Sequence, residues 1–303
     1  MKINSISSSS IFSNAISSNS ISRRVVVILW VLFVGGWSLF SHGYANELAQ
    51  FNKVYDEVLQ EVLVKQTFNS QYGTFHHNAV KYKYLAGNPQ LKALIKKEAA
   101  RLKTIATPPQ KLTHLAFWIN AYNFFTLKAV ADNYPVTSMK KIGWKEKNIF
   151  IGTLTASLDD IEHKIIRPLG DARTHFALNC ASVSCPTLLD RPFVQDTLDA
   201  TLVKLSKEAL RSPIHIRPAV KGLFGGEKLG LSKIFKWYKE DFYLNGETLA
   251  TFIKKYKPAS LTAHPNKGIT YVDYNWDLNT SENINAFIKT LNQEGAKITR
   301  ATP

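Results

Sequence analysis

The chain has 303 residues, of which 45% are hydrophobic and 20% are charged. This is the composition of an ordinary globular protein with enough material for a core, arranged as one large domain or two small ones. The formal net charge is +15, but the lysines are dispersed and the sequence contains no nucleic-acid-binding motif. The composition therefore argues against a nucleic-acid partner in spite of the basic balance.

Residues 1–45 differ in composition from the rest of the chain. Two arginines precede sixteen uncharged residues, 25–40, and the small residues Gly43 and Ala45 stand at the −3 and −1 positions of a cleavage site. This pattern predicts a secretory signal peptide, followed by a mature domain over residues 46–303. Sixteen apolar residues are short for a membrane span, and an uncleaved N-terminal anchor is the alternative. We expect an exported, periplasmic or extracellular protein, anchored to the membrane if the signal is not cleaved.

Cleavage after residue 45 would leave a chain that is still basic. It would remove Lys2, Arg23 and Arg24 and no acidic residue, so 35 basic residues would remain against 23 acidic ones, a net charge of +12. An anionic membrane or a polyanionic cell wall could attract such a chain, but a soluble basic exported protein is the simpler interpretation. Export also exposes the cysteines to an oxidising compartment, in which disulfides form.

The first half of the mature chain is predicted to be helical. Apolar residues at helical spacing indicate a helix over residues 46–66, a second over 90–103 and a third over 110–133. The third helix carries almost no charge, so we expect it at the centre of the core. Asn120 and Asn123 fall at the edge and in the middle of its apolar stripe. Buried amides need hydrogen-bond partners, so these two either hold a neighbouring loop or orient a catalytic histidine or a ligand.

A second polar group is predicted inside an apolar face further along. Residues 149–158 alternate like a strand, and Ser157 looks like the cap of a helix over 158–166, with Asp160 completing a capping box. Glu162 projects into the middle of the apolar face of this helix. A carboxylate there must find a cation, a histidine or hydrogen-bond donors, or else keep its proton, and the nearby arginines at 167 and 173 are candidate partners.

The stretch HFALNC, residues 175–180, reads as a strand, with His175 and Cys180 on opposite faces. A short loop then leads to Cys185. The remaining expected elements are helices over 194–210, 231–242, 247–257 and 282–291, strands over 214–220 and 269–276, and a glycine-rich turn at 224–230 that does not fit a phosphate-binding loop. Helices dominate, so we predict an α+β fold: a mostly helical single domain with a small mixed or antiparallel sheet.

Five stretches of the sequence, in this order, resemble the domain of unknown function 547 family (DUF547). They are FWINAYN (117–123), SLDDIEH (157–163), DARTHFALNCASVSCP (171–186), LSKIFKWYKEDF (231–242) and YVDYNWDLN (271–279). The resemblance covers most of residues 110–280. Because the activity of this family is not settled, the resemblance implies motif positions and no particular reaction. The sequence departs from the family at Ala181, where the turn after Asn-Cys is expected to carry glycine.

Three kinds of site could be built from these motifs, and the first is a catalytic thiol. A nucleophilic cysteine needs a neighbouring base and a group that orients the base. On a regular strand Cys180 would face His163 better than His175, and Cys185, in a loop, is an equal candidate. By analogy of parts, such a centre would belong to a hydrolase or amide-transfer enzyme in the papain or transglutaminase style, with a fold distantly related to theirs. The candidate catalytic residues are Cys180, Cys185, His163, His175, Glu162, Asn120 and Asn123.

The other two sites leave the protein without a free thiol. A disulfide between Cys180 and Cys185 would close a small loop and block thiol chemistry unless it is reduced, which suits a non-catalytic ligand- or partner-binding domain. The same cysteines with His163 and His175 form a two-histidine, two-cysteine zinc set, but the spacing is unusual, and we predict neither a metal nor a cofactor. The ligand would be a small molecule or a peptide. Several tryptophans and tyrosines, including Trp237, could line its groove or fill the core.

Overall fold

The computed structural model describes residues 46–70, 73–105, 115–221, 227–259 and 268–300. The predicted signal peptide at residues 1–45 lies outside the described residues, as do the first residues of the helix predicted over 110–133 and part of the glycine-rich turn. From Leu48 onward the described residues form one compact unit. Within the described ranges, no helix is both long and apolar enough to cross a membrane.

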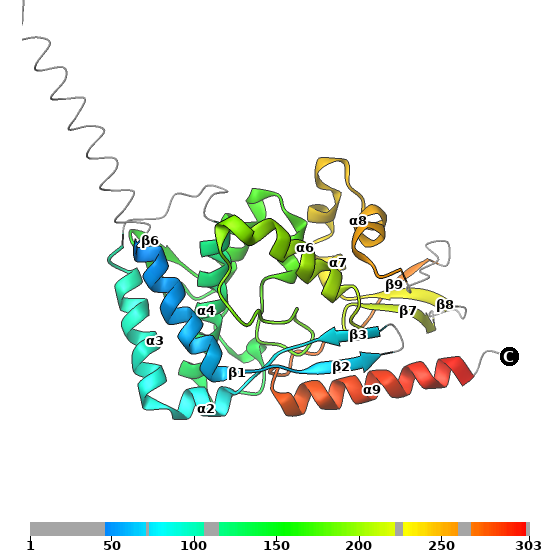
Figure 1. The fold of residues 1–303 in the computed structure, drawn as a ribbon, viewed down its shortest axis with the longest axis horizontal. Coiled ribbons are helices and arrows are strands. Elements are labelled where there is room, and N and C mark those ends of the chain that lie inside the picture. The colour runs from blue at the N-terminus through cyan, green and yellow to red at the C-terminus, as the bar shows by residue number, and fades with distance from the viewer. Residues whose placement is uncertain (1–45, 71–72, 106–114, 222–226, 260–267, 301–303) are drawn as a thin grey trace, which may run out of the picture. The chain divides into compact units, whose positions relative to one another are not determined.

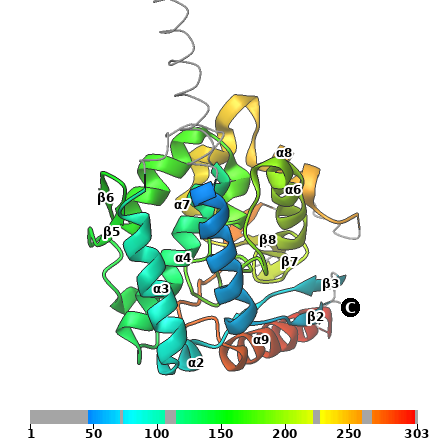
Figure 2. The same ribbon diagram turned by 60° about the vertical axis from the view of Figure 1, so that its left-hand side comes forward.

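The N-terminal half is helical, as the apolar spacing predicts. Residues 46–62 are helical, and α2 (Tyr82–Gly87), α3 (Pro89–Leu102) and α4 (Leu115–Asn133) follow. Proline opens α3, and the Asn88 side chain accepts hydrogen bonds from the amides of its first turn. Nearly every side chain of α4 is buried, and the ring of Phe51 meets those of Phe117 and Phe124 edge-on, with centroids 5.5 Å apart. Figures 1 and 2 show this group of helices together on one side of the unit.

The strands are short and form small separate sheets. Three are antiparallel pairs: β1 (Leu63–Val64) with β4 (Ala79–Val80), β2 (Thr67–Ser70) with β3 (Gly73–His76), and β5 (Ile149–Ile151) with β6 (Leu154–Ala156). The fourth sheet has the order β7 (Ile216–Lys221), β8 (Glu227–Leu231) and β9 (Ile269–Tyr271), antiparallel and then parallel. The fold is therefore α+β and mostly helical, with small sheets, as predicted.

The helix that carries Glu162 begins as the sequence predicts but changes its winding. Ser157 caps α5 (Leu158–Asp160) in a capping box with Asp160. The chain continues as a π-helical segment, η3 (Ile161–Ile166), and then as the short 3₁₀ helix η4 (Arg167–Leu169). Gly170, with a φ of 77°, ends this run in the left-handed region that glycine enters at no steric penalty.

The prediction of a strand over residues 175–180 is wrong. The chain instead forms the 3₁₀ helix η5 (Ala172–Phe176), capped by the Asp171 side chain, and then an irregular loop. The reason lies in α4, because the Asn123 amide donates to the carbonyl of Ala177 and accepts from the amide of Asn179. One side chain thus satisfies backbone groups that a strand would have paired with a neighbour. The alternation that placed His175 and Cys180 on opposite faces does not apply.

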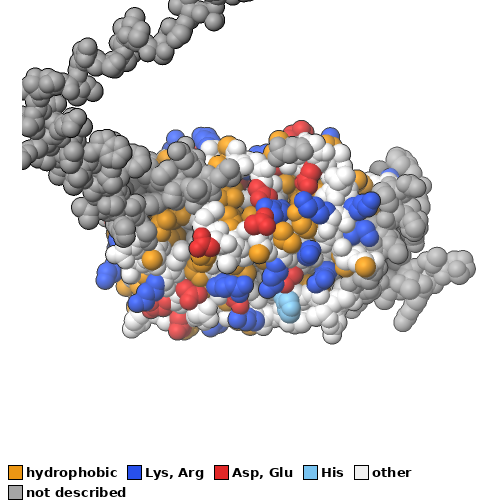
Figure 3. All heavy atoms as spheres, turned by 45° about the horizontal axis from the view of Figure 1, so that its top comes forward, with side chains coloured by type: hydrophobic (Ala, Val, Ile, Leu, Met, Phe, Trp, Pro, Cys, Tyr) orange, Lys and Arg blue, Asp and Glu red, His pale blue; other side chains and the backbone are white. Residues whose placement is uncertain are grey.

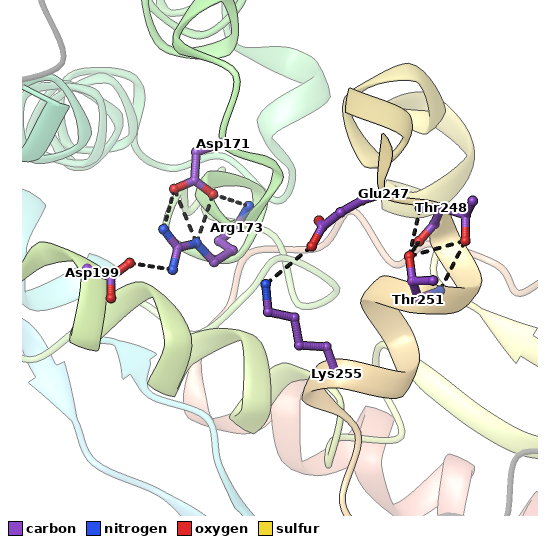
Figure 4. A network of polar contacts seen from close by, with 7 residues as sticks. All are labelled: Asp171, Arg173, Asp199, Glu247, Thr248, Thr251 and Lys255. Carbon is purple, nitrogen blue, oxygen red and sulfur yellow. Dashed lines mark hydrogen bonds and ion pairs between the residues drawn. The ribbon is translucent and has the colours of Figure 1, made fainter. Parts of the chain in front are cut away.

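The remaining helices are η2 (Met139–Lys141), η6 (Gln195–Thr197), α6 (Leu198–Ala209), α7 (Ile234–Trp237), η7 (Lys239–Gly246), α8 (Leu249–Tyr256) and α9 (Ser281–Arg300). The single helix predicted over 231–242 is thus split, because Tyr238 leaves helical geometry and the rest winds as 3₁₀. Figure 4 shows the polar contacts that fix two of these segments. Arg173 pairs with Asp171 and Asp199, joining η5 to α6, and Thr248 and Thr251 form a capping box at the start of α8.

Two buried histidines flank a second, smaller hydrophobic cluster that lies apart from the main core. This cluster joins Phe75 of β3 to Ile284 and Ile288 of α9, and Figure 1 shows the β2–β3 hairpin beside α9. His77 and His215 are each 1% exposed. Burial lowers the pKa of His77 to about 4, and burial together with the charge on His77 lowers the pKa of His215 to about 3.

We expect this pair to make the fold sensitive to acid. In the unfolded chain both imidazoles take up protons near pH 6.5, so the unfolded state binds more protons and stability falls as the pH drops from 7 toward 4. The slope should reach up to about 1.4 kcal/mol per pH unit for each histidine. Urea unfolding between pH 7 and pH 5 checks this. His77→Gln should flatten the slope, whereas His76→Gln, at an exposed neighbour, should leave it unchanged.

Candidate functional site

A pocket of about 290 Å³ brings the predicted polar centre together. Its lining includes Glu162, His163, His175, Cys180 and Cys185. The rest of its wall is largely aromatic, from Tyr122, Trp144, Trp237, Tyr238, Tyr274 and Trp276. Five of the seven residues chosen from the sequence therefore meet in one hollow of the size that holds a small ligand or a single side chain.

Segments from distant parts of the chain deliver these side chains. Glu162 and His163 come from η3, His175 comes from η5, and the cysteines come from the loop that follows it. The aromatic wall adds Tyr122 from α4, the α7–η7 junction, and the segment after β9. The backbone of residues 183–184 is hydrogen-bonded to residues 275–277, so the cysteine loop and the last aromatic segment are held together directly.

The structure joins Cys180 and Cys185 in a disulfide. Cys180 is partly exposed, whereas Cys185 is only 1% exposed. The Sγ atom of Cys185 accepts hydrogen bonds from the Cys180 amide at 2.8 Å and from the Tyr274 hydroxyl at 3.2 Å. Of the alternatives left open by the sequence, the disulfide is the state that the structure contains.

The turn inside the disulfide loop explains the glycine expected at position 181. Ala181 has a φ of 61°, and it is the one non-glycine residue with positive φ among the described residues. The Asn179 side chain holds this conformation, because it accepts from the Ala181 amide and donates to the Pro186 carbonyl. Alanine is strained in this left-handed region by roughly 1–2 kcal/mol, so the Asn179 contacts stabilise a backbone that this sequence does not favour locally.

Glu162 is buried, as predicted, but its partners are not the arginines. It is 4% exposed and accepts hydrogen bonds from the hydroxyl of Tyr122, at 2.8 Å, and from the hydroxyl of Tyr238. Burial and then the charge of Glu162 raise the pKa of both tyrosines well above the ordinary value. The phenols therefore stay protonated and keep donating. Arg167 and Arg173 bind aspartates instead.

His175 is oriented by an aspartate that the sequence analysis missed. Its Nε2 atom lies 2.7 Å from Oδ2 of Asp241, and its ring stacks on Tyr238 with centroids 4.0 Å apart. Burial alone would raise the pKa of Asp241, but hydrogen bonds from His175 and Arg167 outweigh it and hold the pKa well below its usual range. An ionised carboxylate only accepts, so the Nε2 atom carries a proton, and in the neutral imidazole Nδ1 is the nitrogen with the lone pair.

His163 is placed differently, although it lines the same pocket. The Nη1 atom of Arg167 lies 2.8 Å from its Nδ1 atom. A guanidinium can only donate, so this contact occupies the lone pair of Nδ1 and leaves the proton on Nε2. The Nε2 atom faces Asp159 at 3.8 Å. Of the two histidines, His175 therefore has the nitrogen that can accept a proton.

Asn120 and Asn123 do not line the pocket. Asn120 donates to the carbonyl of Phe193 and to the side chain of Asn52, and accepts from the Phe193 amide. Asn123 holds the loop after His175, as described above. The structure thus places both amides in the loop-holding role, and the group that orients an imidazole is Asp241.

Asp241, Tyr238 and Tyr274 were not chosen from the sequence, although all three lie in the recognised stretches LSKIFKWYKEDF and YVDYNWDLN. The signal that could have found them was a polar or aromatic residue with a hydroxyl or carboxylate in each motif. Their contacts join residues 66 to 94 positions apart in the chain. Within the described ranges, no group of three or more His, Cys, Asp or Glu side chains is arranged to hold a metal ion.

Comparison with known families identifies the central part of the chain. Residues 106–208 match the family model described as "Protein of unknown function, DUF547". The match covers about a third of the chain, and over that range it confirms the resemblance seen in the motifs. No curated protein and no solved structure matches the chain.

We expect Glu162→Gln to destabilise the fold by roughly 1–3 kcal/mol, because a glutamine amide would present two donors to a site that offers donors already. The free energy of unfolding in urea is the measurement. Glu240→Gln is the matched control, since Glu240 is exposed, and it should change stability little. Equal effects of the two substitutions would show that the buried position of Glu162 has no energetic role.

Proposed function

We propose that this is an exported thiol-dependent hydrolase or amide-transfer enzyme, with a Cys/His centre in the aromatic pocket. The observation that carries the proposal is the meeting of Cys180 and His175 in one pocket, with Asp241 behind the imidazole. Nucleophile, base and orienting carboxylate are the three parts that covalent thiol catalysis needs. The proposal concerns the site, since the fold by itself implies no activity.

In this mechanism Cys180 is the nucleophile and His175 is the base. The Sγ atom of Cys180, a partly exposed residue, attacks the carbonyl carbon of the substrate as its proton passes to Nδ1 of His175. The imidazolium then gives that proton to the leaving amine, and an acyl thioester forms on Cys180. Water completes hydrolysis, or a second amine completes transfer. Asp241 holds the imidazole in the required tautomer and stabilises its positive charge.

The disulfide is the resting state in this proposal. Cys180 cannot attack a carbonyl while it is bonded to Cys185, so the enzyme is active only after a reductant has opened the bond. Export through the proposed signal at residues 1–45 would place the protein where such disulfides form and persist. The basic balance of the chain would favour anionic surroundings, and Figure 3 shows lysine and arginine side chains interspersed with acidic ones on the face drawn there.

A non-catalytic ligand-binding domain is the second candidate, and the aromatic wall is what favours it. Trp237 is 44% exposed at the pocket. Its ring lies 4.9 Å from that of Tyr274 and 5.5 Å from that of Trp276, measured between centroids. Exposed tryptophans beside a pocket are typical of binding surfaces. In this case the disulfide is structural, and binding does not depend on reduction.

Alkylation with iodoacetamide distinguishes the two candidates. For the enzyme, we expect Cys180 to react only after reduction, and Asp241→Asn or His175→Ala to slow the reaction at neutral pH by about 10-fold or more, because each removes the working base.

The matched control for Asp241→Asn is Asp199→Asn, at an exposed aspartate that pairs with Arg173. It should leave the alkylation rate unchanged. If the alkylation rate is the same in the wild type and in both the His175 and the Asp241 variants, neither residue acts as the base or its support. A ligand-binding domain would then be the better description. Circular dichroism of each variant checks that the fold persists.

A further inference from the structure

The two sulfurs of the disulfide are not equivalent. Cys180 is partly exposed and lines the pocket, whereas Cys185 is 1% exposed. The Cys180 amide donates to Sγ of Cys185, and the Tyr274 hydroxyl lies within hydrogen-bond distance of both sulfurs, 3.2 Å from Cys185 and 3.3 Å from Cys180. Cys180 is therefore the sulfur that an incoming group can reach, and Cys185 is the sulfur whose negative charge its hydrogen bonds would stabilise.

We propose that the pair is a thiol–disulfide exchange site in which an incoming thiolate attacks Cys180 and Cys185 leaves. Exchange proceeds through a mixed disulfide, and its rate depends on which sulfur is accessible and on how well the leaving sulfur carries negative charge. The structure assigns the first property to Cys180 and the second to Cys185. The activity requires no acyl substrate, so it goes beyond the proposed hydrolase.

The hydroxyl of Tyr274 supports the departing sulfur throughout the step. Burial, and then the charge of Glu162, raises the pKa of Tyr274 far above the ordinary value, so its proton stays on the phenol and remains available for donation. The same hydroxyl lies 3.3 Å from Sγ of Cys180. It spans the bond that breaks and can follow the charge as it develops on Cys185.

The reductant supplies the two electrons that the exchange reaction needs. The thiolate forms a bond to Sγ of Cys180, the Cys180–Cys185 bond breaks, and its electron pair remains on Cys185 as a thiolate. A second thiolate of the reductant then attacks the reductant's sulfur in the mixed disulfide, and Cys180 leaves as a thiolate. The reductant loses two electrons and becomes a disulfide, and the protein gains those electrons and holds two reduced cysteines.

The pocket sets the class of partner. A volume of about 290 Å³ between aromatic walls admits a small thiol or the cysteine of a flexible peptide. We infer a thiol-bearing peptide of about the size of glutathione as the natural type of reductant. Opening of this bond would also free Cys180 for the proposed hydrolase chemistry, which gives the exchange reaction a second role as the switch of the same site.

Mapping the mixed disulfide on the wild-type protein tests the direction of attack. The folded protein is treated with reduced glutathione, quenched in acid, alkylated and digested for mass spectrometry. We expect glutathione on Cys180 and the alkyl group on Cys185. Glutathione on Cys185 would overturn the direction, and a disulfide that opens only after unfolding would overturn the exchange activity altogether.

Single-cysteine variants test the same asymmetry without the competing sulfur. Cys185→Ser keeps the accessible thiol and should form a mixed disulfide with oxidised glutathione, whereas Cys180→Ser keeps the buried thiol and should react at least about 10-fold more slowly. Similar rates for the two folded variants would contradict the assignment. The wild-type mapping stands even where one of these variants does not fold.

The role of the tyrosine is tested by removing only its hydroxyl. Tyr274→Phe should slow the opening of the disulfide by about 10-fold, the effect of losing one hydrogen bond to a charged group. Tyr243→Phe, at an exposed tyrosine, is the control and should change nothing. An unchanged rate in Tyr274→Phe would show that the phenol does not stabilise the leaving sulfur. Because these rates involve no acyl substrate, a wrong assignment of the attacked sulfur or of the phenol leaves the hydrolase proposal standing, and a failed hydrolase leaves the exchange reaction standing.

Discussion

The site depends on one buried carboxylate. Glu162 lies within an otherwise apolar helix face, and an unpaired charge there would cost several kcal/mol. The hydroxyls of Tyr122 and Tyr238 satisfy it, and these two tyrosines belong to segments that are far apart in the chain. These two contacts join α4 and the α7–η7 junction to η3. The His175 ring stacks on Tyr238. The position of the imidazole therefore depends on Glu162, which holds the hydroxyl of Tyr238.

The two buried or partly buried acids of the site, Glu162 and Asp241, have different roles. The two acids of the site have different partners: Glu162 is bound by neutral phenols, and Asp241 is bound by Arg167 and His175. Glu162 holds the hydroxyls of two tyrosines in place, and Asp241 fixes which nitrogen of the imidazole carries the proton. Between them, the cysteine loop is held by Asn179 and Tyr274 rather than by regular secondary structure. A loop fixed by side chains can place both sulfurs in the wall of the pocket, which a regular strand could not do.

Features set by neighbours along the chain could be predicted from the sequence, and features set by distant partners could not. The helical spacing of apolar residues predicted α3 and α4, and a serine with an aspartate three positions on predicted the cap of α5. The burial of Glu162 followed from the face on which it lies. The strand over residues 175–180 failed because Asn123, more than fifty positions away, binds its backbone. Asp241 was missed for the same reason, since nothing local marks a residue 66 positions after His175 as its partner.

The π-helical winding of residues 161–166 has a consequence for how the site could have arisen. In this segment the Arg167 amide bonds to the carbonyl of Glu162, five positions back, so the turn contains one residue more than an α-helical turn. Removing one residue between Glu162 and Arg167 would restore the ordinary winding and change the direction of the Arg167 side chain by about 100° relative to Glu162. Arg167 would then swing away from Asp241 while Glu162 kept its tyrosines. The extra residue therefore fixes the direction of Arg167 relative to Glu162. A deletion at this point would separate Arg167 from Asp241 without substituting a residue of the pocket wall.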